Sequence, residues 1–514
     1  MAVEKYDVII IGTGAGGGTL AYHLSQSGKK ILILERGGFL PKENDNWNTE
    51  AVFTRAKYKA KEIWLDKDGK EFHPGIHYYV GGNTKVYGAA LLRFRKEDFG
   101  EIKHHGGVSP AWPISYDDLE PYYTKAEKLY HVHGEAGIDP TEPLRSELFP
   151  YPALKHEPRI QQLFDDLIKS GHHPFPLPIG ARLGSDKPYP QPEYNIGLFD
   201  GFPDPTESKA DAHVVAINPI LKLDNVTLKI HSYVEKLVTD PSGHEVTEVH
   251  VDQDGGKVIY SGHIVVVSCG AINSAALLLR SANGQHPNGL ANSSDMVGRY
   301  YMCHNNSAML AISKEPNPTQ FGKTLALNDF YFKSDDWGYP LGHIQMLGKS
   351  NAEMLKGDAP AFAPGMALDY MARHAIDFWM TSEDLPGPDN RVIFSKNGKI
   401  CLHYRENNLE GHRRLQTKLK DMLKHLGCEK HLFPQNAYLG KKIPLAGTAH
   451  QSGTIRFGTD PKTSALDVNC KTHDLENLYV VDSSFFVSST AVNPSLTIVA
   501  NAMRVGDHIL EKLK

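Results

Sequence analysis

The chain has 514 residues, of which 22% are charged and 40% hydrophobic, a balance that is ordinary for a globular protein with a sizeable core. Its net charge of −5 gives no sign of a nucleic-acid partner or of binding to an acidic membrane. The length corresponds to about three domain-sized units, or to two domains with large insertions. No apolar run has the length of a membrane helix, and no apolar leader precedes the first strand, so we expect a cytoplasmic protein.

Residues 6–38, YDVIIIGTGAGGGTLAYHLSQSGKKILILERGG, have the pattern of a strand, a glycine-rich turn, a helix and a second strand. Gly12 allows the tight turn, Gly14 lets the backbone approach a pyrophosphate, and Gly17 lets the helix pack closely on the strand. Glu35 ends the second strand, where a carboxylate accepts hydrogen bonds from ribose hydroxyls and disfavours a 2′-phosphate. The stretch therefore predicts a dinucleotide site that is not for NADP, with an incidental glycine-rich turn as the alternative.

The next segments are less regular. Residues 81–84, GGNT, form a second glycine-rich turn, either an ordinary loop or a loop whose N–H groups bind a ring or a phosphate. Ser115 is suited to cap a helix that begins just after it, with acidic residues in its first turn. Residues 140–205 contain 13 of the 32 prolines, and we expect mostly surface loops there.

Sheet patterns follow. Residues 225–238 are strand-like, and turn signals at 240–243 and 254–256 predict an antiparallel meander. Residues 264–268, IVVVS, are typical of a buried parallel strand, and they run into Cys269, Gly270 and a helix. This is a second strand–glycine–helix junction.

The second half of the chain mixes strands and helices. Between 305 and 440, strand patterns, a hairpin signal at Asn397-Gly398 and an amphipathic helix near 415–426 predict a sheet covered by helices. Residues 478–481 predict a buried strand that ends at Asp482. We expect Asn493 to be the N-cap and Pro494 the first residue of the last helix.

The five cysteines are widely spaced and form no CxxC pair, which favours reduced buried thiols over a disulfide framework or a zinc site. The histidine pairs at 104–105, 131–133 and 172–173 lack a cysteine or acidic partner at ligand spacing, so we expect no metal site. The cysteines are Cys269, Cys303, Cys401, Cys428 and Cys470.

Taken in order, these motifs resemble those of the glucose–methanol–choline (GMC) family of flavin oxidoreductases, and they extend over nearly the whole chain. The stretch GFP…KADAHV at 201–214 is most similar to the pyranose-oxidase branch, which includes bacterial sugar and C-glycoside 3-oxidases. Besides the first glycine turn with Glu35, the resemblance is carried by GGNT at 81–84, SYVEKLV at 232–238, VVVSCGAINSAALLLRSA at 265–282, VGRYYMCH at 297–304, SEDLPGPDNRV at 382–392, HQSGT at 450–454 and VVDSSFFVSSTAVNPSLTIVANAMRVGDHI at 480–509.

The resemblance implies FAD as cofactor and a catalytic pair made of a histidine and a later histidine or asparagine, here His450 and Asn493. A neutral histidine can accept the hydroxyl proton, while the asparagine binds the same oxygen and a hydride passes to the flavin N5. Taken singly, His450 would be interpreted as a core histidine and Asn493 as a helix cap. The flanking motifs favour catalysis for both.

Fungal pyranose oxidases link FAD covalently to a histidine in an STHW loop, and the aligned residues 84–87, TKVY, place Val86 at that position. We therefore expect non-covalent FAD. The residues to which the resemblance assigns FAD contacts are Gly12, Gly14, Gly17, Glu35, Arg36, Gly81, Gly82, Asn83, Thr84, Val234, Cys269, Gly270, Asp482, Asn493, Pro494 and Thr497.

The implied fold is α/β, or α+β overall, with a Rossmann-like FAD-binding domain and a substrate domain whose mostly antiparallel sheet is covered by helices. Residues 1–45, 73–100, 207–304 and 441–514 would form the discontinuous FAD-binding domain. Residues 305–440, together with the excursion at 101–206, would form the substrate-binding domain.

The expected reaction is FAD-dependent oxidation of a secondary ring hydroxyl, at C2 or C3 of a pyranose sugar or glycoside, to a keto-sugar. O2, giving H2O2, or another acceptor would reoxidise the flavin. Oxidation of a non-sugar alcohol and a non-redox FAD-containing lyase are the alternatives, whereas a binding protein that merely retains FAD is disfavoured by the catalytic pair. We expect a small-molecule substrate and no nucleic-acid or membrane partner, and the pattern is compatible with a homo-oligomer.

Overall fold

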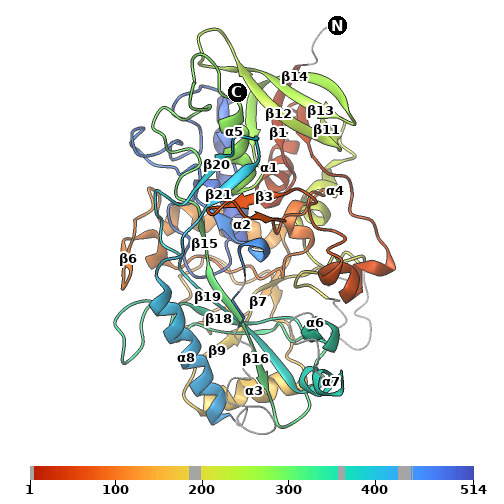
Figure 1. Ribbon diagram of the computed structural model, residues 1–514, viewed down its shortest axis with the longest axis vertical. Coiled ribbons are helices and arrows are strands. Elements are labelled where there is room, and N and C mark those ends of the chain that lie inside the picture. Colours follow the sequence, from red (N-terminus) through yellow and green to blue (C-terminus); the bar gives the residue numbers. More distant parts are fainter. Residues whose placement is uncertain (1–4, 184–197, 357–364, 427–440, 443) are drawn as a thin grey trace.

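The computed structural model describes residues 5–183, 198–356, 365–426, 441–442 and 444–514. Two large sheets organise the fold: a seven-stranded sheet lies in the upper part of Figure 1, and a six-stranded sheet lies in the lower part, where β16, β18 and β19 are labelled. The upper sheet is built around parallel strands, and the lower sheet is antiparallel. This arrangement confirms the expected fold class.

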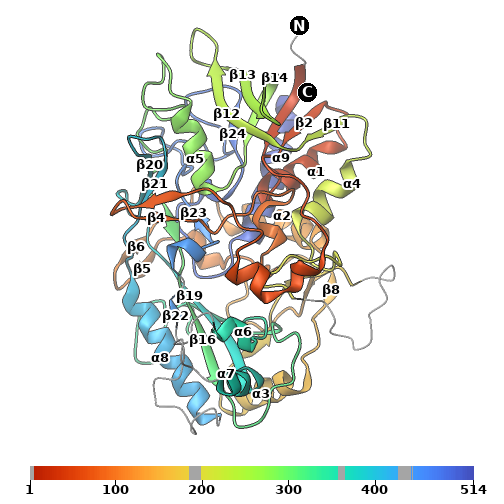
Figure 2. The ribbon, with the colours of Figure 1, turned by 45° about the vertical axis from the view of Figure 1, so that its right-hand side comes forward.

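The upper sheet begins with the predicted unit of β1 (Lys5–Ile11), α1 (Ala15–Ser25) and β2 (Ile31–Leu34). β1 pairs in parallel with β2 on one side and with β14 (Gly256–Val267) on the other. The apolar residues of β1 and β2 are buried on both faces, as a parallel sheet covered by helices requires. The last helix, α9 (Ser495–Lys512), packs against α1, and both are visible beside this sheet in Figure 2.

The predicted meander is present but begins later than expected. β12 (Ser232–Thr239) pairs antiparallel with β13 (Val246–Gln253), which pairs with the first half of β14. β11 (Val226–Lys229) instead pairs in parallel with β2. The run 225–238 is therefore two strands, because the backbone turns at His231, whose φ is +51°. The seventh strand, β24 (Leu478–Val480), pairs in parallel with the end of β14, from which α5 (Ala271–Arg280) follows.

The lower sheet has helices on both faces. Its strands alternate in direction, and along β16 Met309 and Ala311 belong to one core while Leu310 belongs to another. The first core lies under α3 (Pro158–Lys169) and α8 (Leu409–His425), the second under α6 (Ala352–Lys356) and α7 (Gly365–His374). In order across the sheet, the strands are β22 (Lys441–Lys442), β16 (Asn305–Ile312), β19 (Ala375–Ser382), β18 (His343–Met346), β17 (Leu325–Leu327) and β9 (Pro174–Pro176).

The expectation of surface loops over 140–205 is wrong for residues 158–180. This segment contains α3, whose Ile160, Leu163 and Leu167 are buried at helical spacing, and β9, which forms an edge of the lower sheet. The prolines concealed this pattern, although Pro158 sits in the first turn of α3, where proline is tolerated. Residues 184–197 of the same stretch lie outside the described part of the chain.

A four-stranded sheet packs against the upper part of the fold. The order of its strands is β20 (Arg391–Phe394), β21 (Ile400–His403), β3 (Trp64–Asp66) and β4 (Glu71–Phe72). β20 and β21 pair antiparallel, which confirms the predicted hairpin at Asn397-Gly398. β21 also pairs with β3, from much earlier in the chain, and β20 packs against α5. The proposed domain division remains a prediction. The β20–β21 hairpin fits it least, because it belongs to the expected substrate-binding domain but packs against α5 of the expected FAD-binding domain. The other α-helices and strands are α2 (Tyr116–Leu129), α4 (Asn218–Ile220), β5 (Ile102–His104), β6 (Gly107–Ser109), β7 (Val132–Gly134), β8 (Tyr151–Pro152), β10 (Ile179–Gly180), β15 (Met302–Cys303) and β23 (Gln451–Ser452).

Ser115 caps α2, since its hydroxyl accepts from the Asp118 N–H while the Asp118 carboxylate accepts from the Ser115 N–H. Four cysteines are free thiols, whereas Cys428 lies outside the described residues. Within the described ranges, no cluster of three or more potential ligands could hold a metal ion, and no helix is long and apolar enough to cross a membrane.

Candidate active site

Strands β2, β1, β14 and β24 end in register at one edge of the upper sheet. The segments that follow these four strands carry Glu35, Gly12, Cys269 and Asp482, respectively. Ligands of open α/β sheets bind outside the carboxyl ends of the strands. The register of the sheet thus brings together four residues that were predicted from separate parts of the sequence.

A cavity of about 620 Å³ opens at this edge, within the usual size range of small-molecule sites. It includes most of the residues predicted for the site. Those that line it are Gly12, Gly14, Glu35, Arg36, Gly82, Asn83, Thr84, Val234, Cys269, Gly270, Asp482, Asn493, Pro494 and His450.

Three of the predicted residues do not line the cavity. A Cβ at Gly17 would lie 2.1 Å from the Gly12 carbonyl oxygen, so Gly17 serves the close packing of α1. Gly81 has a φ of +98° and donates its N–H to the Thr13 hydroxyl at 2.9 Å. The hydroxyl of Thr497 is fully buried and lies 2.7 Å from the Tyr123 hydroxyl, so its side chain does not face the cavity, and the contact of Thr497 with the cofactor remains a prediction.

The turn before α1 fits a pyrophosphate. A Cβ at Gly14 would meet no atom within 4 Å, so this position opens onto the cavity. Gly12, in contrast, has a φ of +102° and would place a Cβ 2.2 Å from the Ser268 carbonyl oxygen. Because no side chain caps α1, its first N–H groups and its positive dipole end are available to an anion. The cradle therefore fits the phosphates of FAD.

Glu35 is held firmly at the edge of the cavity. One carboxylate oxygen accepts from the Thr13 N–H at 3.2 Å and hydroxyl at 2.5 Å, and the other accepts from the Gly37 N–H at 2.9 Å. Burial raises the pKa of Glu35, and these hydrogen bonds oppose that rise. Arg36 lies between the Tyr78 and Tyr233 rings, with its guanidinium carbon 4.1 Å and 4.4 Å from their centroids. These groups suit the adenosine half of the cofactor.

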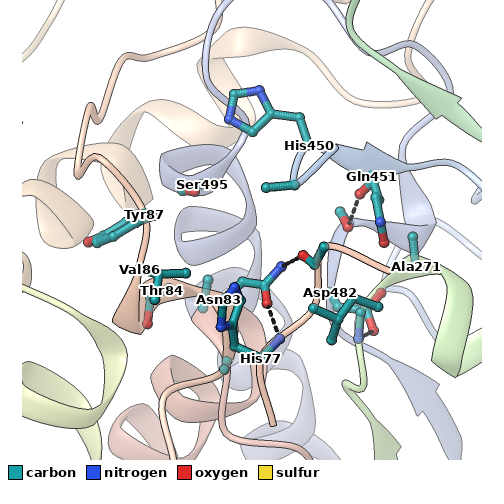
Figure 3. Close-up of a pocket in the computed structure, with 18 of the residues that line it drawn as sticks. His77, Asn83, Thr84, Val86, Tyr87, Ala271, His450, Gln451, Asp482 and Ser495 are labelled. Carbon is teal, nitrogen blue, oxygen red and sulfur yellow. Dashed lines mark hydrogen bonds between the residues drawn. The ribbon is translucent and has the colours of Figure 1, made fainter. Parts of the chain in front are cut away.

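The GGNT turn forms another wall. Gly82–Lys85 is a single 3₁₀ turn that follows the left-handed Gly81. The Asn83 side chain is fixed by accepting from the His77 N–H at 2.9 Å and by donating to the Gly75 carbonyl at 3.3 Å, and the first of these bonds joins two residues labelled in Figure 3. Val86 follows this turn and also lines the cavity.

His450 lies across the cavity from Asn83 and Thr84 (Figure 3). It immediately precedes β23, which pairs with β15. Its Nδ1 lies 2.9 Å from the Nδ1 of His304, and its Nε2 forms no hydrogen bond with any residue that the structure describes. Burial, followed by the nearby His304 and Lys323, holds the pKa of His450 well below its usual value, so the ring is neutral at pH 7.

Asn493 reaches the same cavity from the segment before α9. The expectation that it caps this helix is wrong, because Pro494 occupies the cap and α9 begins at Ser495. The residue is 8% exposed, and its amide forms no hydrogen bond within the described part of the chain. Pro494 and Ser495 bring the uncapped, positive end of α9 to the cavity wall.

Sequence reasoning missed several polar residues at the site and did not distinguish Trp379 from the other aromatic residues between 330 and 379, of which one or two were expected to stack on a ligand ring. Trp379 of β19 lines the cavity with its ring centroid 5.1 Å from that of His450, and Asp200 and Lys323 form an ion pair of 2.8 Å in the wall. His304 was within a quoted motif, but nothing in its spacing linked it to His450. All four come from segments far from His450 in the chain, so no local pattern connects them.

Comparisons with known proteins identify the family of the chain. Residues 6–306 and 403–502 match the N-terminal and C-terminal family models, both described as GMC oxidoreductase. The 6'''-hydroxyparomomycin C oxidase of Streptomyces lividus is 28% identical, with 100% of this chain and 92% of that protein aligned. The fructose dehydrogenase large subunit of Gluconobacter japonicus is 26% identical over 99% of this chain and 98% of its own.

A solved structure from a study of FAD modification in Aspergillus oryzae formate oxidase has the same fold, with a TM-score of 0.70 at 14% identity. The match covers 100% of this chain and 99% of the other. The two family models together cover more than half of the chain and include the dinucleotide cradle and both cavity residues, His450 and Asn493. The chain belongs to the GMC oxidoreductase family.

Proposed function

We propose that this GMC oxidoreductase oxidises a secondary ring hydroxyl, at C2 or C3 of a pyranose sugar or glycoside, to a ketone. The observation that carries the proposal is the convergence of two polar groups, His450 Nε2 and the Asn493 amide, on the cavity that contains the dinucleotide cradle. Neither group is hydrogen-bonded to a described residue, so both are available to a substrate hydroxyl. The names of the relatives, a paromomycin-type oxidase and a fructose dehydrogenase, support a hydroxylated substrate.

FAD would supply the acceptor for the hydride that leaves the carbinol carbon. His450 is neutral at pH 7 and acts as the base that accepts the hydroxyl proton. Asn493 binds the same oxygen and so orients the carbinol carbon. The positive end of α9 stabilises negative charge that develops beside it.

The far wall of the cavity supports a sugar-like ring. Trp379 offers an aromatic face close to His450, while Asp200 and Lys323 offer hydrogen-bonding groups. Such a wall suits a ring with C–H bonds on its face and hydroxyls at its edge. The Asp200 carboxylate is held by Lys323 and by the Gly348 N–H at 2.7 Å, so it is preoriented.

The cofactor is held without a covalent bond in this proposal. Val86, at the position of the linking histidine, has no nucleophilic atom. Acid precipitation of the purified protein should therefore release the FAD into the supernatant. Flavin that stays with the precipitate would contradict this part of the proposal.

The substrate class is tested by anaerobic mixing of the FAD-loaded protein with pyranoses, O- and C-glycosides and aryl alcohols. Bleaching of the flavin absorbance by pyranoses or glycosides, with a keto-sugar as product, is the expected result, and its return in air identifies O2 as an acceptor. Bleaching only by aryl alcohols would refute the sugar substrate. Conversion of a substrate without bleaching would instead indicate a lyase.

The role of His450 is tested by His450→Ala. We expect the rate of flavin reduction to fall by about 10²- to 10⁴-fold, the usual contribution of a general base, while FAD stays bound. His425→Ala, at the exposed end of α8, is the matched control and should reduce its flavin at the normal rate. Normal reduction in His450→Ala would show that this histidine is not the base.

A further inference from the structure

His304 and His450 are brought together by a short antiparallel ladder. β15 and β23 pair Cys303 with Gln451, so the next residue of one strand lies opposite the preceding residue of the other. The two Nδ1 atoms are 2.9 Å apart and the ring planes are nearly perpendicular, at 88°. His304 is only 3% exposed and does not line the cavity, so it reaches the cavity wall through its ring contact with His450 and through its carbonyl, which accepts from the Asn306 amide at 2.7 Å.

The second nitrogen of His304 determines where its proton lies. His304 Nε2 is 3.1 Å from the carbonyl oxygen of Ser489, and since a carbonyl only accepts, Nε2 must carry a hydrogen. Burial lowers the pKa of His304 to about 4, so the ring is neutral at pH 7 and has only this one N–H. Its Nδ1 is therefore an acceptor.

The proton of His450 follows from this. In the contact between the two Nδ1 atoms, one nitrogen must donate, and only His450 can do so. His450 then holds its proton on Nδ1, which leaves a lone pair on Nε2. We infer that His304 is a positioning residue that imposes this tautomer on His450 and makes Nε2 the proton-accepting atom of the site.

His304 also connects the two catalytic segments. Its Nδ1 accepts from His450, and its Nε2 donates to the carbonyl of Ser489. Ser489 lies four residues before Asn493, in the segment that leads to α9. The Ser489 hydroxyl donates in turn to the Asp384 carbonyl at 3.0 Å. The inference rests on the proposed function in that it takes His450 as the base.

The charged groups around the pair act in opposite senses. Lys323, on the substrate side, lowers the pKa of His450, whereas Glu383 raises the pKa of His304, although burial outweighs it. Trp379 lies against His450 without a charge. A change in the acidic limb of a pH profile can thus be assigned to His304 only when Lys323 and Glu383 are left unchanged.

The test compares His304→Gln with His304→Phe. The glutamine amide presents an acceptor and a donor with a spacing close to that of the two ring nitrogens, whereas phenylalanine keeps the ring shape without either. In His304→Phe we expect flavin reduction to slow by about 10- to 100-fold, as for loss of a buried hydrogen bond that orients a base. Its acidic limb should move to lower pH. At pH 7 His304 is neutral, so it does not repel a charge on His450, and its Nδ1 stabilises protonated His450 as a hydrogen-bond acceptor that phenylalanine lacks. Only a protonated His304 would lower the pKa of His450. His304→Gln should restore most of the rate of flavin reduction and return the acidic limb to nearly its normal pH.

His412→Gln is the matched control. His412 is a buried histidine with two hydrogen-bond partners, Ser307 and Ser382, and it lies away from the cavity lining. This variant should leave the acidic limb in place. A His304→Phe variant with the normal rate and limb would overturn the inference, as would a His304→Gln variant that is as impaired as His304→Phe.

A neutron structure of the FAD-loaded, unsubstituted protein reads the tautomer directly. The expected map has hydrogen on Nδ1 of His450 and on Nε2 of His304, with none on Nε2 of His450. Hydrogen on Nε2 of His450 would refute the inference. This measurement needs no substrate, so failure of every sugar to reduce the flavin would reject the proposed function while the neutron map still decides the tautomer.

Discussion

At the scale of single residues, Asn493 stands out by its unused hydrogen-bonding capacity. Amide groups that are shut off from water nearly always have partners, whereas the Asn493 amide is not among the enclosed polar atoms without a partner and faces the cavity. Asn493 is 8% exposed, lines the cavity and has no hydrogen bond within the described part of the chain. A bound hydroxyl that supplies the missing partner would account for this arrangement.

We therefore expect Asn493→Ala to slow flavin reduction by the best substrate by about 10- to 100-fold, since the substrate oxygen loses a positioning hydrogen bond. FAD content should stay the same, because the cradle lies on other segments. Stopped-flow absorbance under anaerobic conditions measures the rate. Asn397→Ala, in the exposed turn of the β20–β21 hairpin, is the control, and equal rates in the two variants would contradict the role of Asn493.

At the scale of elements, the glycines of the first turn divide into two kinds. Gly14 faces open space in the cavity, whereas Gly17 has the Gly12 carbonyl oxygen 2.1 Å from where its Cβ would lie. The first position leaves room for a ligand, and the second lets α1 pack on its strand. Substitutions at Gly14 and at Gly17 should therefore have separate effects, the first on cofactor binding and the second on folding stability.

Gly14→Ala should weaken FAD binding by at least about tenfold, because a methyl group enters the phosphate cradle, while the apo-protein unfolds at its usual temperature. Gly17→Ala should destabilise the apo-protein by about 1–3 kcal/mol, the usual effect of overpacking. Flavin fluorescence titration and thermal unfolding of the two apo-variants measure these effects. The idea fails if Gly14→Ala lowers the unfolding temperature as much as Gly17→Ala does.

At the scale of the whole molecule, buried neutral histidines make the fold sensitive to acid. Burial lowers the pKa of His304 and His412 to about 4 and that of His343 to about 3. In the unfolded chain these groups titrate near 6.5, so between these pH values the unfolded state binds more protons and stability falls as the pH falls. Asp98, whose pKa burial raises to about 7, and Glu35, Asp377 and Asp482, whose pKa burial also raises, work in the opposite direction. The buried histidines outnumber them, since the pKa of His77, His156 and His450 is lowered as well.

The thermal unfolding temperature of the FAD-loaded protein should therefore fall steadily from pH 7 to pH 5. Each of the three histidines contributes a loss of about 1.4 kcal/mol per pH unit below 6.5. His412→Gln should show a shallower fall, since one of these groups is removed. A temperature that is constant or rises over this range would contradict the linkage.

The parts of the fold that could be predicted depend on local physical rules. The prediction of the βαβ unit in residues 6–38 was correct, because glycine spacing and strands buried on both faces produce patterns that can be recognised within a few residues. The meander and the β20–β21 hairpin were predicted for the same reason, through their turn residues. α3 was missed because proline density obscured its helical spacing, and the strand at 225–238 was not divided because no turn signal marks His231.

By itself, the sequence determined the family, the dinucleotide cradle and the identity of His450 and Asn493 as candidates, since each rests on short motifs in order along the chain. Only the tertiary structure decided how these motifs meet: four strand ends in register bring Glu35, Gly12, Cys269 and Asp482 to one edge. It also decided that His304 contacts His450. A hydrogen bond between distant residues depends on the pairing and packing of whole strands, which no local pattern encodes.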